Sequence, residues 1–207
     1  MNNTRLLSVL FPNWLWSLPK GNGRIALTFD DGPHPDTTPA LLRALDELKI
    51  KATMFLVGMR CEGHHSLIRE IESAGHAIAN HGYNHSRHAL RGRRFQKESI
   101  QQTETTILES GVTMQKLFRP PFGSFDFTTG SILKELGYRG VIWSVLVWDW
   151  THQTPEHLWK RTQRRLHDGA IIVLHDGHPT TPTMISMLPY LAEAVHGCEW
   201  TFDRLSS

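Results

Sequence analysis

Hydrophobic and polar positions after residue 23 alternate between short apolar runs and longer amphipathic stretches. The short runs are rich in β-branched and aromatic residues and end near Gly, Pro or Asp, which is typical of buried strands. They predict strands at 24–29, 52–57, 76–79, 116–118, 141–147 and 170–174, with a candidate seventh at 199–202. The amphipathic stretches predict helices at 38–48, 64–74, 95–110, 127–136, 155–167 and 182–195.

This alternation favours a parallel sheet with right-handed crossovers. About seven strand–helix units fall in residues 24–207, with no internal repeat and no linker, so we predict one α/β domain built as a compact barrel. Residues 1–23 precede it as a separate lead-in segment. Its apolar side chains are expected to cover one end of the core: Leu6, Leu7, Leu10, Phe11, Trp14 and Trp16.

The lead-in also indicates in which cellular compartment the protein is expected. Its apolar run, Leu6–Phe11, stops at Pro12, far short of the ~20 residues that a membrane span requires. No small-x-small cleavage pattern follows it, which argues against a secretory signal. We therefore expect no membrane span and favour the cytoplasm, with the cell envelope as the alternative.

Composition narrows the function classes. Of the 207 residues, 40% are hydrophobic and 20% are charged, which excludes a disordered chain, and a net charge of +2 gives no reason to expect a nucleic-acid partner. Cys61 and Cys198 are far apart and lie in no CxxC pattern, which excludes a disulfide scaffold and a zinc ribbon. Histidine stands out, at 13 residues, because it is the commonest metal ligand and a near-neutral acid or base.

Polar and rare residues cluster at the carboxyl ends of the predicted strands. In a β/α barrel this rim is where catalytic residues collect from several strands. Five strands contribute to it: Asp30 and Asp31; His81 and His85; Arg119; Asp149 and Trp150; His175 and Asp176. We therefore place the functional site at this rim.

His81 and His85 are four residues apart, so one helical turn would let both bind a single ion. A bare HxxxH spacing more often marks surface or capping histidines. Asp31 on the neighbouring strand end changes that balance, because it completes an Asp-His-His set with a position open to water, the make-up of a catalytic zinc site. Such a set also accepts Co²⁺ or Fe²⁺.

The remaining rim residues suggest acid–base chemistry. Asp30-Asp31-Gly32 could be an ordinary turn, but two adjacent carboxylates would repel unless one binds a cation and the other acts as a base. A bidentate Arg119 is the expected partner of Asp30. His175 could be a satisfied core histidine, yet at this rim it is better explained as a proton donor to a leaving group.

Five segments in this order resemble the motifs of the polysaccharide deacetylase family, the NodB-homology domains of carbohydrate esterase family 4. They are Thr28–Gly32, His81 with His85, Arg119–Gly123, Trp148–Trp150 and Ile172–His175. The resemblance spans residues 24–207 and implies a distorted (β/α)7 TIM-like barrel as the catalytic domain. It implies that Asp30 is the general base, that Arg119 positions it and that His175 is the general acid. It also implies one divalent metal, Zn²⁺ first and Co²⁺ as an alternative, on Asp31, His81 and His85.

Two positions depart from the family pattern. The fourth motif usually has an Asp where this chain has Leu146, and the third usually has a Tyr where it has Phe122. The first change would matter if that Asp tunes the acid or shapes the pocket. The second removes a hydroxyl, while the Phe122 N–H can still stabilise an oxyanion. We add Trp150 and Leu174 as walls around the acyl methyl, and Asp149 as a further substrate-binding residue.

The resemblance implies a metal-dependent hydrolase that removes the N-acetyl group from an amino sugar of a chitin- or peptidoglycan-like polysaccharide or oligosaccharide and releases acetate. Its partner is then a carbohydrate, and we expect a monomer. The alternatives are a deformylase or O-acetyl esterase acting on another carbohydrate, and a catalytically idle glycan-binding barrel.

Two sets of side chains stay open between a structural and a functional interpretation. A basic run is typical of a solvated helix approach but could contact an anionic glycan: Arg87, Arg91, Arg93, Arg94 and Lys97. Four tryptophans could be core residues or could stack on a sugar ring: Trp143, Trp148, Trp150 and Trp159.

Overall fold

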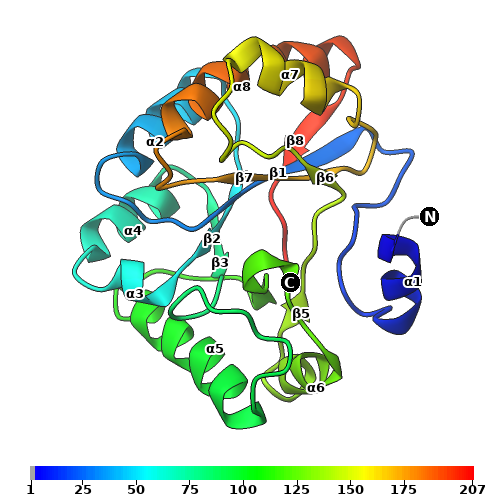
Figure 1. The fold of residues 1–207 in the computed structure, drawn as a ribbon. Helices are drawn as coiled ribbons and strands as arrows, with labels where there is room; N and C mark the ends of the chain where they lie inside the picture. The colour runs from blue at the N-terminus through cyan, green and yellow to red at the C-terminus, as the bar shows by residue number, and fades with distance from the viewer. Residues whose placement is uncertain (1–2) are drawn as a thin grey trace.

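The computed structural model describes residues 3–207, which form an eight-stranded sheet surrounded by helices (Figure 1). The strands are β1 (Arg24–Asp30), β2 (Thr53–Leu56), β3 (Ala77–Asn80), β4 (Leu117–Phe118), β5 (Arg139–Gly140), β6 (Val145–Leu146), β7 (Ile171–His175) and β8 (Thr201–Asp203). The helices are α1 (Asn3–Leu10), α2 (Thr38–Glu47), α3 (Gly58–Cys61), α4 (His65–Ser73), α5 (Arg93–Leu108), the 3₁₀ turn η1 (Pro121–Gly123), α6 (Phe127–Glu135), α7 (Pro155–Gln163) and α8 (Thr181–Gly197).

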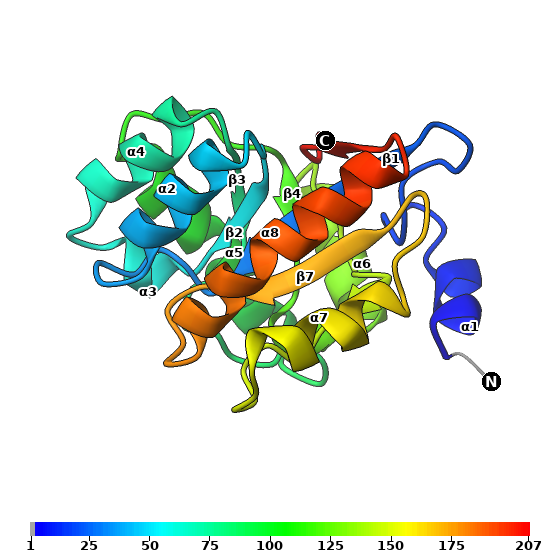
Figure 2. The ribbon, with the colours of Figure 1, turned by 90° about the horizontal axis from the view of Figure 1, so that it is seen from above.

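The strands are arranged in the order β5-β4-β3-β2-β1-β7-β6, and β8 pairs with the first residues of β1. Every pair is parallel. The sheet curls into a half-barrel with its helices on the outside, and α8 lies along β7 with α7 beside it (Figures 1 and 2). The predicted single-domain α/β fold with a distorted barrel is confirmed. Because the pairing is parallel, the carboxyl ends of the strands meet at one rim.

The prediction of one strand over 141–147 is wrong, because this part of the chain is divided between the two ends of the sheet. β5 ends just before it, and β6 begins only at Val145. Between them the backbone pairs with the lead-in, where the Ile142 N–H donates to the Leu15 carbonyl at 2.9 Å. Leu18 then donates to the Gly169 carbonyl at 2.8 Å, so the lead-in bridges the space between β5 and β7.

The lead-in packs against α6 and β5, and it contains a short helix, α1, that the sequence pattern did not predict. Its predicted core contacts are confirmed for Phe11 and Trp14, which are buried, while Leu7 and Trp16 are half-buried and Leu10 is exposed. The side chain of Leu6 lies outside the described residues. Gly140 permits this packing, because a Cβ there would lie 2.2 Å from the Trp14 ring.

The core runs along both faces of the central strands. The four apolar residues of β7 are fully buried, as the continuous apolar run at 170–174 predicted for a strand covered on both faces. Within residues 3–207, none of the helices combines the length and the apolar character needed to cross a membrane.

Candidate active site and metal centre

The parallel register of β1 and β7 places the candidate base beside the candidate acid. Asp30, the last residue of β1, is the register partner of His175, the last residue of β7. Arg119 comes directly after β4, whose Phe118 pairs with Asn80 at the end of β3. The strand ends therefore bring together residues that lie far apart in the sequence, as the rim argument predicted.

Arg119 is fully buried and anchors Asp30. One nitrogen, Nη1, donates to Asp30 Oδ1 at 2.6 Å and to Thr28 Oγ1 at 2.7 Å. The predicted bidentate pairing is therefore wrong, since Nε and Nη2 have no hydrogen-bond partner among the described residues. The guanidinium lies over the Phe55 ring, 4.1 Å from its centroid. Burial lowers the pKa of Arg119, and the neighbouring Asp30 opposes that shift.

Asp31, His81 and His85 converge on one point. One ligand atom from each lies within 4.8 Å of the others. Asp31 Oδ1 is 2.9 Å from His85 Nε2 and 3.4 Å from His81 Nε2. Burial raises the pKa of the Asp31 carboxyl, but the two neighbouring imidazoles outweigh it and hold the pKa well below its usual range.

The donor atoms of this cluster suit a metal ion. Asp31 Oδ1 is buried with no hydrogen bond of acceptable geometry in residues 3–207, so it is an orphaned acceptor. The His81 Nδ1 lies 2.7 Å from the Arg119 carbonyl, which can only accept, so Nδ1 carries the proton and Nε2 keeps its lone pair for a cation. Two imidazole nitrogens and a carboxylate oxygen with no internal partner fit a divalent ion.

The local backbone, and not a helical turn, brings these ligands together. The predicted helical HxxxH arrangement is wrong, since residues 81–85 form a loop in which His85 adopts a φ of +52°. Asp31 also has a positive φ, of +74°, a strained conformation for a residue with a side chain. Its carbonyl accepts a 2.5 Å hydrogen bond from Arg60 Nη1, which holds the strained residue in place.

His175 is fixed by a single carboxylate. Asp149 Oδ2 accepts from the His175 backbone N–H at 2.7 Å, and Asp149 Oδ1 lies 2.8 Å from His175 Nδ1. The Trp150 ring packs edge-on against the imidazole, with centroids 4.9 Å apart. Burial lowers the pKa of His175, but the hydrogen bond and charge of Asp149, with smaller contributions from Asp30 and Asp31, raise it to about 9.

Asp176, the other rim residue after β7, ties the loop behind the site to the sheet. It accepts from Thr37 Oγ1 at 2.6 Å and from Thr38 Oγ1, and its backbone N–H donates to the Asp30 carbonyl at 2.9 Å. Burial raises its pKa. Thr38 is the first residue of α2, and Thr37 lies at its N-cap position.

A cavity of about 440 Å³ opens over these groups. Seven of the predicted site residues line it: Asp30, Asp31, His81, His85, Phe122, Trp150 and His175. Three further residues line it: Trp143, which the sequence left open between core and sugar contact, Leu146 of the fourth motif, and His178, which no sequence signal indicated. Two predicted substrate-binding residues do not line it. Leu174 is completely buried in the core, and Asp149 lies beneath His175.

Phe122 lies at the mouth of this cavity. Its ring is 56% exposed, packs 4.6 Å from the His85 ring and has Arg87 over its face at 4.8 Å. Its φ of +59° turns the backbone sharply toward the site. Phe122 therefore contributes an aromatic contact with a candidate metal ligand, without the hydroxyl usual for this motif.

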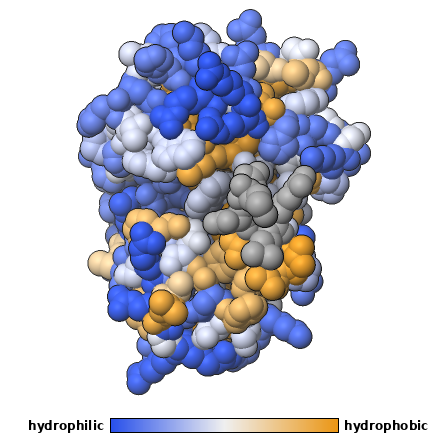
Figure 3. All heavy atoms as spheres, turned by 45° about the vertical axis from the view of Figure 1, so that its right-hand side comes forward, coloured by the Kyte–Doolittle hydropathy of each residue, from blue (hydrophilic) through white to orange (hydrophobic). Residues whose placement is uncertain are grey.

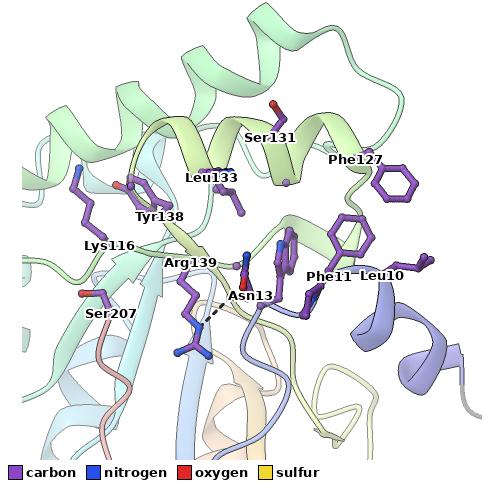
Figure 4. A pocket seen from close by; sticks show the side chains of 16 residues that line it. Leu10, Phe11, Asn13, Lys116, Phe127, Ser131, Leu133, Tyr138, Arg139 and Ser207 are labelled. Atoms are coloured by element: carbon purple, nitrogen blue, oxygen red, sulfur yellow. Dashed lines mark hydrogen bonds between the residues drawn. The ribbon is translucent and has the colours of Figure 1, made fainter.

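A larger cavity, of about 640 Å³, lies between the lead-in and α6 (Figure 4). Arg139 points into it and donates to the Asn13 carbonyl at 3.1 Å, and Phe127 and Phe11 form its apolar side (Figure 4). It lies beside the start of β5, away from the rim, and among residues 3–207 no Asp, Glu or His side chain lines it. We therefore place the chemistry in the smaller cavity.

Comparison with known proteins agrees with this geometry. The sequence model of the polysaccharide deacetylases matches residues 18–141. The chain belongs to the polysaccharide deacetylase family. It is therefore a hydrolase of a family whose members depend on a metal, and the cluster of Asp31, His81 and His85 is the candidate site for that metal.

Three relatives place the chain within the family. It is 32% identical to a peptidoglycan-N-acetylglucosamine deacetylase of Bacillus cereus over 85% of both chains. It is 33% identical to a chitooligosaccharide deacetylase of Azorhizobium caulinodans over 78% of both. A crystal structure of a peptidoglycan N-acetylglucosamine deacetylase superposes with a TM-score of 0.91 and 26% identity, over 96% of this chain and 94% of the other.

Proposed function

We propose that this chain hydrolyses the N-acetyl group of N-acetylglucosamine residues in a chitin- or peptidoglycan-like glycan and releases acetate. The observation that carries the proposal is the pairing of Asp30 with His175 across β1 and β7, beside the cluster of Asp31, His81 and His85. A base, an acid and a candidate metal site in one cavity suit hydrolysis, whereas a glycan-binding module requires none of them together. The names of the relatives support the substrate class.

The metal is proposed to be Zn²⁺, with Co²⁺ as the alternative, held by Asp31, His81 and His85. Two imidazoles and one carboxylate, with a position left for water, form the usual ligand set of a catalytic zinc site. When bound, the ion supplies Lewis-acid polarisation of the acyl carbonyl and lowers the pKa of water towards ~7.

Asp30 is proposed to take the proton of the attacking water. Arg119 occupies its Oδ1, while its Oδ2 lies 3.8 Å from His81 Nε2, at the edge of the candidate metal site. The base is thereby oriented toward the place where water must be activated, and its rotamer is held by a fully buried partner. Such a fixed base contributes about 10²–10⁴-fold to a hydrolytic rate.

His175 is proposed to complete the reaction from the other side of the cavity. As water adds to the acyl carbon, the C–N bond must break, and an amine leaves poorly unless its nitrogen is protonated. With Nδ1 held by Asp149, Nε2 is free to deliver that proton. A pKa of about 9 keeps His175 protonated at neutral pH, which suits a general acid.

The walls of the cavity are proposed to select a small acyl group on a sugar. Trp150, Trp143 and Leu146 form an apolar surface beside the acid and base. The Phe122 N–H is the proposed donor to the developing oxyanion. All these groups come from one chain, which supports a monomer as the active unit.

The test is elemental analysis of the purified protein, followed by acetate release from chitin oligomers and peptidoglycan fragments. We expect about one divalent ion per chain and release that stops on chelation and returns with Zn²⁺. Release of formate or of ester-linked acetate alone would favour a deformylase or an O-acetyl esterase. Protein with no bound metal and no hydrolysis would refute the proposal.

A further inference from the structure

A third cavity, of about 570 Å³, continues from the catalytic cavity along the segment that links β5 to β6. The two cavities share Phe122, Trp143 and Leu146. We call this third cavity the side groove. Beyond the shared wall its lining is aromatic and basic, and includes Trp16, Phe125, Trp148, Arg165 and His167. Its volume lies within the ~300–1,000 Å³ typical of ligand sites, and a polymer entering the catalytic cavity has room to extend into it.

The shared wall carries no negative charge. Leu146 stands where the family usually has an aspartate, and it lines both cavities. A carboxylate here would repel an acidic ligand passing from one cavity into the other, whereas an apolar side chain does not. Trp143, which lines both cavities, offers a flat apolar surface of the kind that covers the face of a sugar ring.

Two arginines of the α7 region pack on Trp148: Arg165 lines the side groove, and Arg161 lies beside it and lines a neighbouring cavity. The guanidinium carbons of Arg161 and Arg165 lie 4.8 Å and 5.1 Å from the centre of the Trp148 ring. Cation–π contacts of this kind limit the freedom of long side chains and so prepare them for a ligand. Within residues 3–207, neither arginine forms an ion pair with a carboxylate: Arg161 donates to Gln153, and Arg165 to the Arg161 carbonyl.

The basic run considered in the sequence differs in this respect. Arg93 and Lys97 both pair with Glu135, and Arg94 pairs with Glu98. Only Arg87 and Arg91 of this run form no ion pair in residues 3–207, and they lie over the rings of Phe122 and Phe95. A larger group of unpaired cations lies around α7, where Lys160 and Arg164, like Arg161 and Arg165, are free of ion pairs in the described chain.

We propose that the side groove binds a sugar residue that carries an acidic group and that neighbours the N-acetylated residue in the catalytic cavity. Arg165 and His167 would contact the acid, with Arg161 beside them on Trp148, and Trp143 would contact the sugar ring. The proposal rests on the proposed function, because it takes the catalytic cavity as the place of the N-acetylated sugar. It makes this enzyme selective for anionic glycans over neutral ones.

The test compares three substrates of equal length. These are a neutral chitin oligomer, a chitin oligomer carrying a phosphate, and a peptidoglycan glycan fragment with a free carboxylate, assayed also after that carboxylate is amidated. The variants are the double substitution R161Q/R165Q, which removes the charge, and R161K/R165K, which keeps it. Arg43→Gln, on the exposed face of α2, is the matched control.

We expect R161Q/R165Q to raise KM for the acidic substrates roughly three- to tenfold, with little change in kcat and less than twofold change on the neutral oligomer. The lysine variant should retain most of the preference, and amidation should remove it. Response to the carboxylate or to the phosphate tells which acid the groove accepts. Equal effects on neutral and acidic substrates, or none on the acidic ones, would overturn the proposal.

The side groove can be tested even if no substrate is hydrolysed. Binding of the same three glycans, measured by calorimetry in an Asp30→Asn background, reports the groove without turnover. Weaker binding of acidic glycans by R161Q/R165Q supports the proposal, and unchanged binding refutes it. Absence of acetate release by the wild-type protein would count only against the proposed function.

Discussion

Asp149 holds His175 at two points, with one carboxylate oxygen on the backbone N–H at 2.7 Å and the other 2.8 Å from Nδ1. This pairing fixes the imidazole and raises its pKa, which gives the candidate acid its proton at neutral pH. The presence of Leu146 in place of the usual motif aspartate leaves this pairing intact. The partner of the acid is Asp149, and Leu146 only forms a wall of the cavity.

Asp149→Asn should move the alkaline limit of activity to lower pH. The His175 pKa of about 9 means that the acid loses its proton, and the enzyme its activity, as the pH rises through that value. Removing the Asp149 charge lowers this pKa, so the alkaline limb of kcat against pH shifts downward, and kcat at neutral pH falls about 10- to 100-fold. Asp46→Asn, on the exposed side of α2, is the control. If the alkaline limb does not shift, Asp149 does not raise the pKa of the catalytic acid.

Asp30→Asn and His175→Ala should each reduce acetate release by about 10²–10⁴-fold while the bound metal is retained. Asparagine preserves the shape of Asp30 and can still accept from Arg119, so the effect isolates the lost base. The measurements are turnover and metal content of the same preparation. Loss of metal in either variant would contradict the assigned roles.

His85→Ala should lower the metal content and abolish turnover. Two ligands remain, and Asp31 Oδ1 loses the imidazole that lies 2.9 Å away. The melting temperature of the wild-type protein should fall on chelation, because metal bound only to the folded state stabilises it, whereas the variant should not respond. His152→Ala, at an exposed position, should behave as wild type. Full metal occupancy in His85→Ala would remove His85 from the ligand set.

Gly140→Ala should destabilise the fold by about 1–3 kcal/mol through overpacking. The added Cβ would lie 2.2 Å from the Trp14 ring, where lead-in and β5 approach each other. Chemical unfolding measures the change in the free energy of unfolding. Gly197→Ala, which meets no atom within 4 Å, is the control and should change it by less than about 0.5 kcal/mol. Equal stability of both variants would mean that the lead-in is not tightly packed.

The rim was predictable from the sequence because each catalytic candidate follows directly after an apolar run. In a parallel sheet such positions meet whatever the details of packing, which is why Asp30 and His175 could be placed together before the register was known. The error over Leu174 has a simple cause. Neighbouring residues of a strand point to opposite faces, so the residue before His175 faces the core.

The sequence by itself therefore determined the α/β class, the parallel order of elements and the identity of the residues at the rim, since periodicity and strand ends are local properties of the chain. Only the tertiary structure decided that Asp149 lies within hydrogen-bond distance of His175, that Arg119 binds Asp30 through a single nitrogen, and that the lead-in lies between β5 and β6. These features depend on contacts between residues far apart in the sequence. Their geometry follows from how the curled sheet and the lead-in pack, which no local pattern encodes.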